Sequence, residues 1–134
     1  MSRSGYTDDA PHLELYRANV RRTIHSKRGQ QFLAELLATL DAMPEKVLID
    51  RELMDAGGAV CAIGAVCKAR GMDVSRVDYD NPEAVGNVVG ISRIMAAEIE
   101  YENDEGNWRE RYETPEQRWE RMRKWAEDHL VKST

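Results

Sequence analysis

The sequence predicts an all-α fold, a compact single-domain bundle of about five to seven helices. Apolar residues recur at spacings of three and four along most of the chain, which is the pattern of one helix face. Glycine and proline separate these segments, and aromatic residues make up 7% of the chain, so the core must be mainly aliphatic. A chain of 134 residues can bury one hydrophobic core without metal or disulfide support.

The first helix is expected after a flexible segment over residues 1–10, within a helical domain over 11–134. It begins near Pro11, and we expect Gly29 to break or kink it. Its apolar face has helical spacing: Leu13, Tyr16, Val20 and Ile24. The clearest helix of the chain follows over 30–42, carries a wide apolar stripe and ends before a proline.

The segment over 45–58 fits two structures. Its apolar residues suit either a short strand followed by a turn or a helix that runs into a glycine pair, and we predict a helix. The next segment, 59–70, is apolar nearly all round, which predicts a buried helix closed by Gly71. Cys61 and Cys67 lie about 120° apart around such a helix, so we expect two buried reduced thiols.

A helix-turn-helix-like corner is predicted in the third quarter of the chain. A short helix over 82–89 starts at the signal Asp80, Asn81 and Pro82 and ends at Gly90. Ser92 caps a second helix that runs to about Asn103. The spacing could present a recognition helix to DNA, but the second helix carries mostly carboxylates and has Arg93 alone to meet phosphate. We therefore interpret the corner as a core-packing element and keep DNA reading as the alternative.

The last helix has a strong start signal, because Thr114 and Gln117 have the spacing of a capping box. It is expected to run to about Val131, with tryptophans on or near its inner face. We expect the helices over 30–42, 59–70 and 92–103 to form the core, with this C-terminal helix packed across them.

The net charge of −5 is concentrated in one window. Residues 72–107 contain two basic and nine acidic residues, a net charge of −7, whereas the other parts of the chain are nearly neutral. The window predicts either a solvated acidic face or a docking surface for a basic partner, and it should repel nucleic acid. The predicted partner-binding residues are Glu98, Glu100, Glu102, Asp104, Glu105, Trp108 and Tyr112.

A basic cluster near the N-terminus is the alternative binding patch. Its residues are Arg17, Arg21, Arg22, Lys27 and Arg28. Three interpretations are open: these cations pair with the acidic window of this chain or of a second copy in a homodimer, they form a plain solvated face, or they grip an acidic protein or nucleic acid.

The sequence contains no recognisable catalytic, cofactor-binding or metal-binding constellation. His12, His25 and His129 lie near predicted helix ends without metal-ligand spacing, and there is no phosphate-cradling loop or serine elbow. A calcium loop aligned on Gly106 would place Tyr101 where a carboxylate is required. We therefore expect no enzyme activity, no catalytic residue, no cofactor and no metal ion.

The chain lacks the roughly 18 to 20 consecutive apolar residues that span a bilayer. Its first residues are polar and acidic rather than an export signal. We expect a cytoplasmic protein that makes no membrane contact.

Several stretches between Arg28 and about Trp125 read RGQQFLAELLATLDAMPEKVLI, VCAIGAV, GISRIMAAEI, YENDEG and TPEQRWERMRKW. In these stretches the chain resembles a group of small uncharacterised helical proteins of bacteriophages and prophages, which has no settled activity. The resemblance implies context rather than chemistry and carries over no site residue. Small phage accessory proteins often bind and block a host protein.

The sequence thus predicts a protein-interaction module that acts through an acidic helical surface on a partner with a basic surface. The resemblance adds the hypothesis of a phage-encoded inhibitor or modulator of a host protein. The alternative is a helix-turn-helix-like DNA-binding transcriptional regulator.

Overall fold

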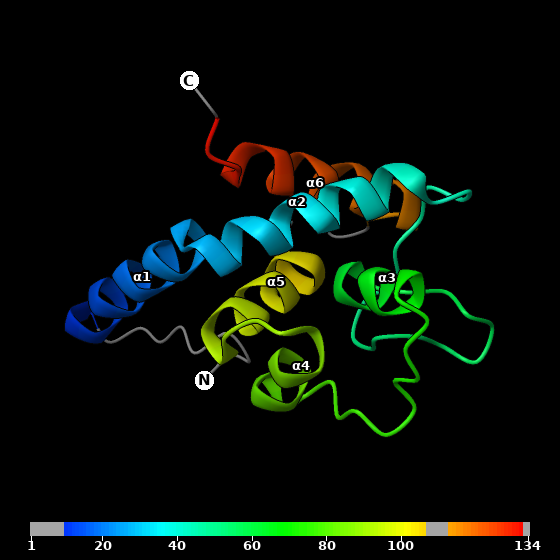
Figure 1. Ribbon diagram of the computed structural model, residues 1–134, viewed down its shortest axis with the longest axis horizontal. Coiled ribbons are helices and arrows are strands. Elements are labelled where there is room, and N and C mark those ends of the chain that lie inside the picture. Colours follow the sequence, from blue (N-terminus) through cyan, green and yellow to red (C-terminus); the bar gives the residue numbers. More distant parts are fainter. Residues whose placement is uncertain (1–9, 107–112, 133–134) are drawn as a thin grey trace.

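The computed structural model describes residues 10–106 and 113–132, with side chains from residue 14 onward, and this part of the chain is helical without strands. The predicted all-α class is therefore confirmed (Figure 1). Its helices are α1 (Ala10–His25), α2 (Lys27–Ala42), α3 (Ala62–Ala69), α4 (Pro82–Val89), α5 (Arg93–Glu105) and α6 (Pro115–His129). Apart from Ala10, which begins α1, the segment predicted to be flexible lies outside the described residues.

The break between α1 and α2 falls at Ser26 and not at Gly29. The Ser26 hydroxyl donates to the carbonyl oxygen of Thr23 (2.6 Å) and accepts from the backbone N–H of Gly29 (3.0 Å), so it ends one helix and caps the next. Gly29 lies inside α2, where a Cβ atom would overlap the carbonyl oxygen of Thr23. Glycine is needed here for close approach rather than for breaking the helix.

The helix predicted over 45–58 is wrong. The chain instead forms bends that close in an isolated antiparallel bridge between Met54 and Val60. Asp55 accepts the backbone N–H groups of the following turn, and Gly58 has a φ of 86°, which reverses the chain direction. The apolar residues of this loop anchor it to the core through two buried leucines: Leu48 and Leu53.

The core forms where α5 lies among α1, α3, α4 and α6, while α2 packs on α3 and α6 (Figure 1). Most of the large apolar side chains that are fully buried come from the predicted core helices and from α6: Leu33, Leu36, Leu40, Ile63, Val66, Met95, Ile99 and Met122. Leu48 of the loop and Val85 of α4 join them. The prediction of a core built from the helices near 30–42, 59–70 and 92–103 is confirmed.

Helix ends follow the predicted capping residues. The Asn81 side chain caps α4, Gly90 ends it with a φ of 84°, and Ser92 caps α5. Thr114 and Gln117 form both hydrogen bonds of the capping box at the start of α6. These ends were predictable because a cap depends on residues within one turn of the chain.

Helix α3 is shorter than predicted because its first turn is replaced by the returning loop. Cys61 is the N-cap, and its sulfur accepts the backbone N–H of Gly64 at 3.3 Å. A Cβ atom at Gly64 would overlap the carbonyl oxygen of Leu53, so the glycine at this position of α3 admits the backbone of the loop. Both cysteines are free and buried, as predicted.

Among the described residues, no helix combines the length and the apolar character that crossing a bilayer would require.

Candidate functional site

The acidic residues of α5 do not form one open face. Glu98 and Glu100 are 7% and 1% exposed, so their side chains do not form the open surface on which their predicted contact with a partner depends. The reason is the central position of α5, whose residues 95–100 are all buried against neighbouring elements. Burial, followed by the charge of Glu98, raises the pKa of Tyr16, which places Glu98 near α1.

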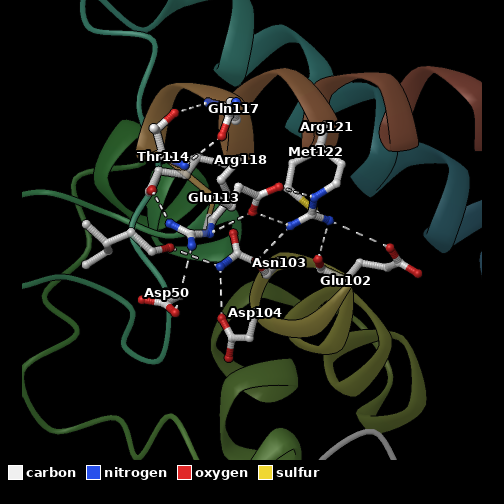
Figure 2. Close-up of polar contacts among 12 residues, drawn as sticks. Asp50, Glu102, Asn103, Asp104, Glu113, Thr114, Gln117, Arg118, Arg121 and Met122 are labelled. Atoms are coloured by element: carbon white, nitrogen blue, oxygen red, sulfur yellow. Dashed lines mark hydrogen bonds and ion pairs between the residues drawn. The ribbon is translucent and has the colours of Figure 1, made fainter. Parts of the chain in front are cut away.

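Arg121 of α6 closes the C-terminal end of α5 (Figure 2). Its guanidinium donates to the carbonyl oxygens of Glu102 and Asn103, the latter at 3.1 Å, and lies 3.9 Å from the Glu102 carboxylate. Burial raises the pKa of Glu102, and the charge of Arg121 opposes that rise. Carbonyl groups at a helix C-terminus favour a cation, so Arg121 both caps α5 and neutralises part of its acidity.

Glu113 joins two arginines of α6 (Figure 2). Its carboxylate accepts from Arg121 at 2.7 and 2.9 Å and lies 3.4 Å from Arg118, and its side chain is 8% exposed. Arg118 also donates to the carbonyl oxygen of Leu48 at 3.0 Å and lies 3.9 Å from Asp50. This network fixes the 43–61 loop to the start of α6.

Asn103 and Asp104 bind the loops that surround the end of α5. The Asn103 amide accepts from the backbone N–H of Ala62 and donates to the carbonyl oxygen of Ile49, both at 3.0 Å. Asp104 accepts from the Tyr79 hydroxyl at 2.9 Å, and burial raises the pKa of that hydroxyl. Asp104 was predicted as a partner contact, but it serves as an internal acceptor.

Three further residues of this region were predicted to contact a partner: Glu105, Trp108 and Tyr112. Glu105 is partly exposed and makes no hydrogen bond or ion pair to another described residue. Trp108 and Tyr112 lie outside the described residues. The acidic window therefore does not present the continuous α5 surface that the sequence predicted.

The exposed negative charge of the window lies instead on the loop before α4 and on the first turn of α4. The exposed carboxylates are those of Asp73, Asp78 and Asp80 on the loop and Glu83 in the helix. Asp73 and Asp78 each accept a backbone N–H two residues further on, at 2.9 Å, so these two shape turns of the loop.

The residues of the basic cluster are exposed. Its five residues, Arg17, Arg21, Arg22, Lys27 and Arg28, are exposed on α1 and the first turn of α2, and we call them the cationic ridge. Within residues 10–106 and 113–132, none of their side chains makes a hydrogen bond or an ion pair. The predicted pairing of this cluster with the acidic window of the same chain does not occur among these residues.

A groove of about 780 Å³ lies between α2, α3 and the 43–61 loop. Its lining is mainly apolar and small, with Val47, Val60 and Ala65 among its residues. Two charged residues of its edge are engaged, because Glu35 binds Arg70 and Lys68 donates to a loop carbonyl oxygen at 2.9 Å. The groove thus differs in chemistry from the cationic ridge.

The described histidines serve their own helices. His25 and His129 each place Nδ1 2.7 Å from the carbonyl oxygen four residues earlier. His129 also stacks on Trp125, with ring centroids 4.6 Å apart. Over the residues that the structure covers, no three histidine, cysteine or carboxylate side chains gather as metal ligands would.

Sequence reasoning missed the inward direction of the acidic residues and the two arginines that meet them. One signal was available: Glu98 and Glu100 are two positions apart, which separates them by about 200° around a helix, so one exposed face could not hold both. The partners Arg118 and Arg121 carried no such signal, because they meet α5 and the 43–61 loop through the tertiary fold alone.

Compared with protein-family models, with curated proteins and with solved structures, the chain gives no match. The resemblance to small phage proteins therefore stays a prediction.

Proposed function

We propose that this chain is a protein-interaction module that binds an acidic surface of a partner protein through the cationic ridge. The observation that carries the proposal is the exposure of five cations that have no partner among the described residues. The carboxylates of the predicted surface on α5 are less available to a partner, because most of them are buried or bonded to donors within the protein. The expected sign of the partner's surface is thus reversed. The resemblance to phage proteins suggests a host protein as that partner.

Charge on the cationic ridge favours rapid and selective encounter more than tight binding. An exposed ion pair contributes only about 0–1 kcal/mol, since water and salt screen it. Complementary charge across an interface mainly raises the association rate and rejects partners of the wrong sign. The proposal therefore expects association that slows as ionic strength rises.

DNA reading through α4 and α5 receives less support. A recognition helix must enter a groove, whereas the middle of α5 is buried among four other helices. The cationic ridge could still meet phosphates, and a net charge of −5 opposes that contact. We keep nucleic acid as an outcome of the test.

The test compares affinity purifications with the wild-type chain and with the double variant Arg17→Glu, Arg21→Glu. Every candidate partner is then purified and its direct binding measured at low and physiological ionic strength. The proposal expects an acidic partner whose binding weakens at least about tenfold in the variant and falls with salt.

The matched control is the double variant Arg76→Glu, Lys132→Glu. Both residues are exposed and unpaired among the described residues, so the control changes the net charge equally, away from the cationic ridge. Equal losses in both variants would contradict the proposal. Salt-sensitive retardation of duplex DNA that depends on Arg17 and Arg21 would replace it with the nucleic-acid alternative.

A further inference from the structure

A pocket of about 350 Å³ opens beside the cationic ridge, where α1 meets α2 and α5 begins. Its lining residues include Arg22, Thr23, Ser26, Arg28, Ile91 and Met95. Two members of the cationic ridge thus border a concavity, whereas the other three lie outside its lining.

The pocket combines cationic and apolar chemistry. Arg22 and Arg28 are exposed and make no ion pair with another described residue. Ile91 and Met95 reach the lining from the hydrophobic core and are 5% and 1% exposed, so they add a small apolar surface beside the two arginines. An inorganic anion would satisfy the arginines but could not use the apolar lining.

The walls of the pocket are held in place by local structure. Ser26 bonds across the α1–α2 break, and Gly29 permits the carbonyl groups of α1 to approach α2 closely. A preformed pocket lowers the ordering cost of binding, and its volume falls at the lower end of known ligand pockets.

We infer that this pocket receives one large apolar side chain of an acidic peptide segment, whose flanking carboxylates pair with Arg22 and Arg28. The inference rests on the proposed function and adds the anchor that exposed ion pairs cannot provide. Interfaces draw most of their affinity from a few buried anchors in pockets, surrounded by contacts of little energy. Because arginines and apolar side chains line the same pocket, it favours a peptide segment that carries both carboxylates and an apolar side chain.

The experiment measures fluorescence anisotropy of labelled peptides of about 12 residues, long enough to cover the pocket and the cationic ridge. One is rich in aspartate and glutamate around a central phenylalanine, a second replaces that phenylalanine with alanine, and a third keeps it among lysines. We expect the acidic phenylalanine peptide to bind at least about tenfold tighter than either of the others. The alanine peptide lacks the aromatic side chain that the pocket would bury, and the lysines of the third peptide repel the arginines.

Filling the pocket should remove this preference. Thr23→Trp places a large side chain in the pocket lining, and Thr39→Trp is the matched control on α2 at the 780 Å³ groove. We expect Thr23→Trp to bind both acidic peptides equally and Thr39→Trp to keep the difference. Circular dichroism checks the fold, and Arg22→Glu with Arg28→Glu is a second variant that leaves the core side chains intact.

The possible outcomes separate the two proposals. Equal binding of the phenylalanine and alanine peptides, both weakened by Arg17→Glu and Arg21→Glu, would overturn the pocket and keep the proposed function. Binding of neither acidic peptide would overturn both. Equal binding of the lysine-rich peptide would overturn the charge selection that both require.

Discussion

At the scale of single residues, the fold depends on close approaches and buried ion pairs that no local pattern reveals. Gly29 and Gly64 allow backbones to meet where any Cβ atom would overlap a carbonyl oxygen. Glu113 is held between two guanidinium groups with 8% of its side chain exposed. Both kinds of contact make strong predictions, because their removal leaves either a clash or a poorly solvated charge.

Gly29→Ala should destabilise the protein by about 1–3 kcal/mol, since the added methyl group forces α1 and α2 apart. Chemical denaturation measures the free energy of unfolding. Gly57→Ala is the control, because its Cβ would meet only an Asp55 oxygen at 3.5 Å, and it should stay within about 0.5 kcal/mol of wild type. A Gly29→Ala protein as stable as that control would refute the close approach.

Arg121→Met should cost about 2–4 kcal/mol, because it leaves Glu113 with fewer donors and uncaps the end of α5. Lys124→Met removes an exposed pair with Asp128 on the same helix and should cost less than about 1 kcal/mol. Adding Glu113→Met to Arg121→Met should recover part of the loss, as a double-mutant cycle would detect. Equal costs for the two single variants would contradict the network.

At the scale of elements, the caps of α4, α5 and α6 were predictable, whereas the caps of α2 and α3 and the long-range turns were not. The starts of α4, α5 and α6 follow from Asn81, Ser92 and Thr114, whose bonds close within one turn. The helix prediction for the 43–61 loop was wrong because its backbone groups form hydrogen bonds with Val60, Asn103 and α6 rather than with residues one helical turn away. The apolar residues of the loop fit a helical pattern, but their partners lie far along the chain.

The ion pair between Glu35 and Arg70 links α2 to the end of α3 and makes stability depend on pH. The hydrogen bond from Arg70 lowers the pKa of Glu35, so its stabilisation is present above the ordinary value of 4.5 and is lost as pH falls through the lower folded value. Glu35→Gln should cost less than about 1 kcal/mol at neutral pH, since the pair is partly exposed. The difference from wild type should vanish in acid, and a cost that persisted there would show that the charge is not its source.

At the scale of the whole molecule, the fold places acidic and basic side chains in different environments. Four of the five carboxylates of α5 are buried or meet donors from α6 and the loops, whereas the five cations of the cationic ridge on α1 and α2 are exposed. Composition gives the net charge of −5 but not this sorting, because the direction of each side chain depends on which helix lies at the centre. The fold class and most helices were therefore predictable, and the choice of which charged side chains stay exposed was not.

The most direct test of this account is the association of the wild-type chain with the acidic and the lysine-rich phenylalanine peptides as ionic strength increases. The account predicts that the acidic peptide binds, that its association rate falls with salt, and that Arg17→Glu with Arg21→Glu weakens the salt dependence, because three cations of the cationic ridge remain. Preferential binding of the lysine-rich peptide would contradict it, because an open negative surface would then be the one that the molecule presents.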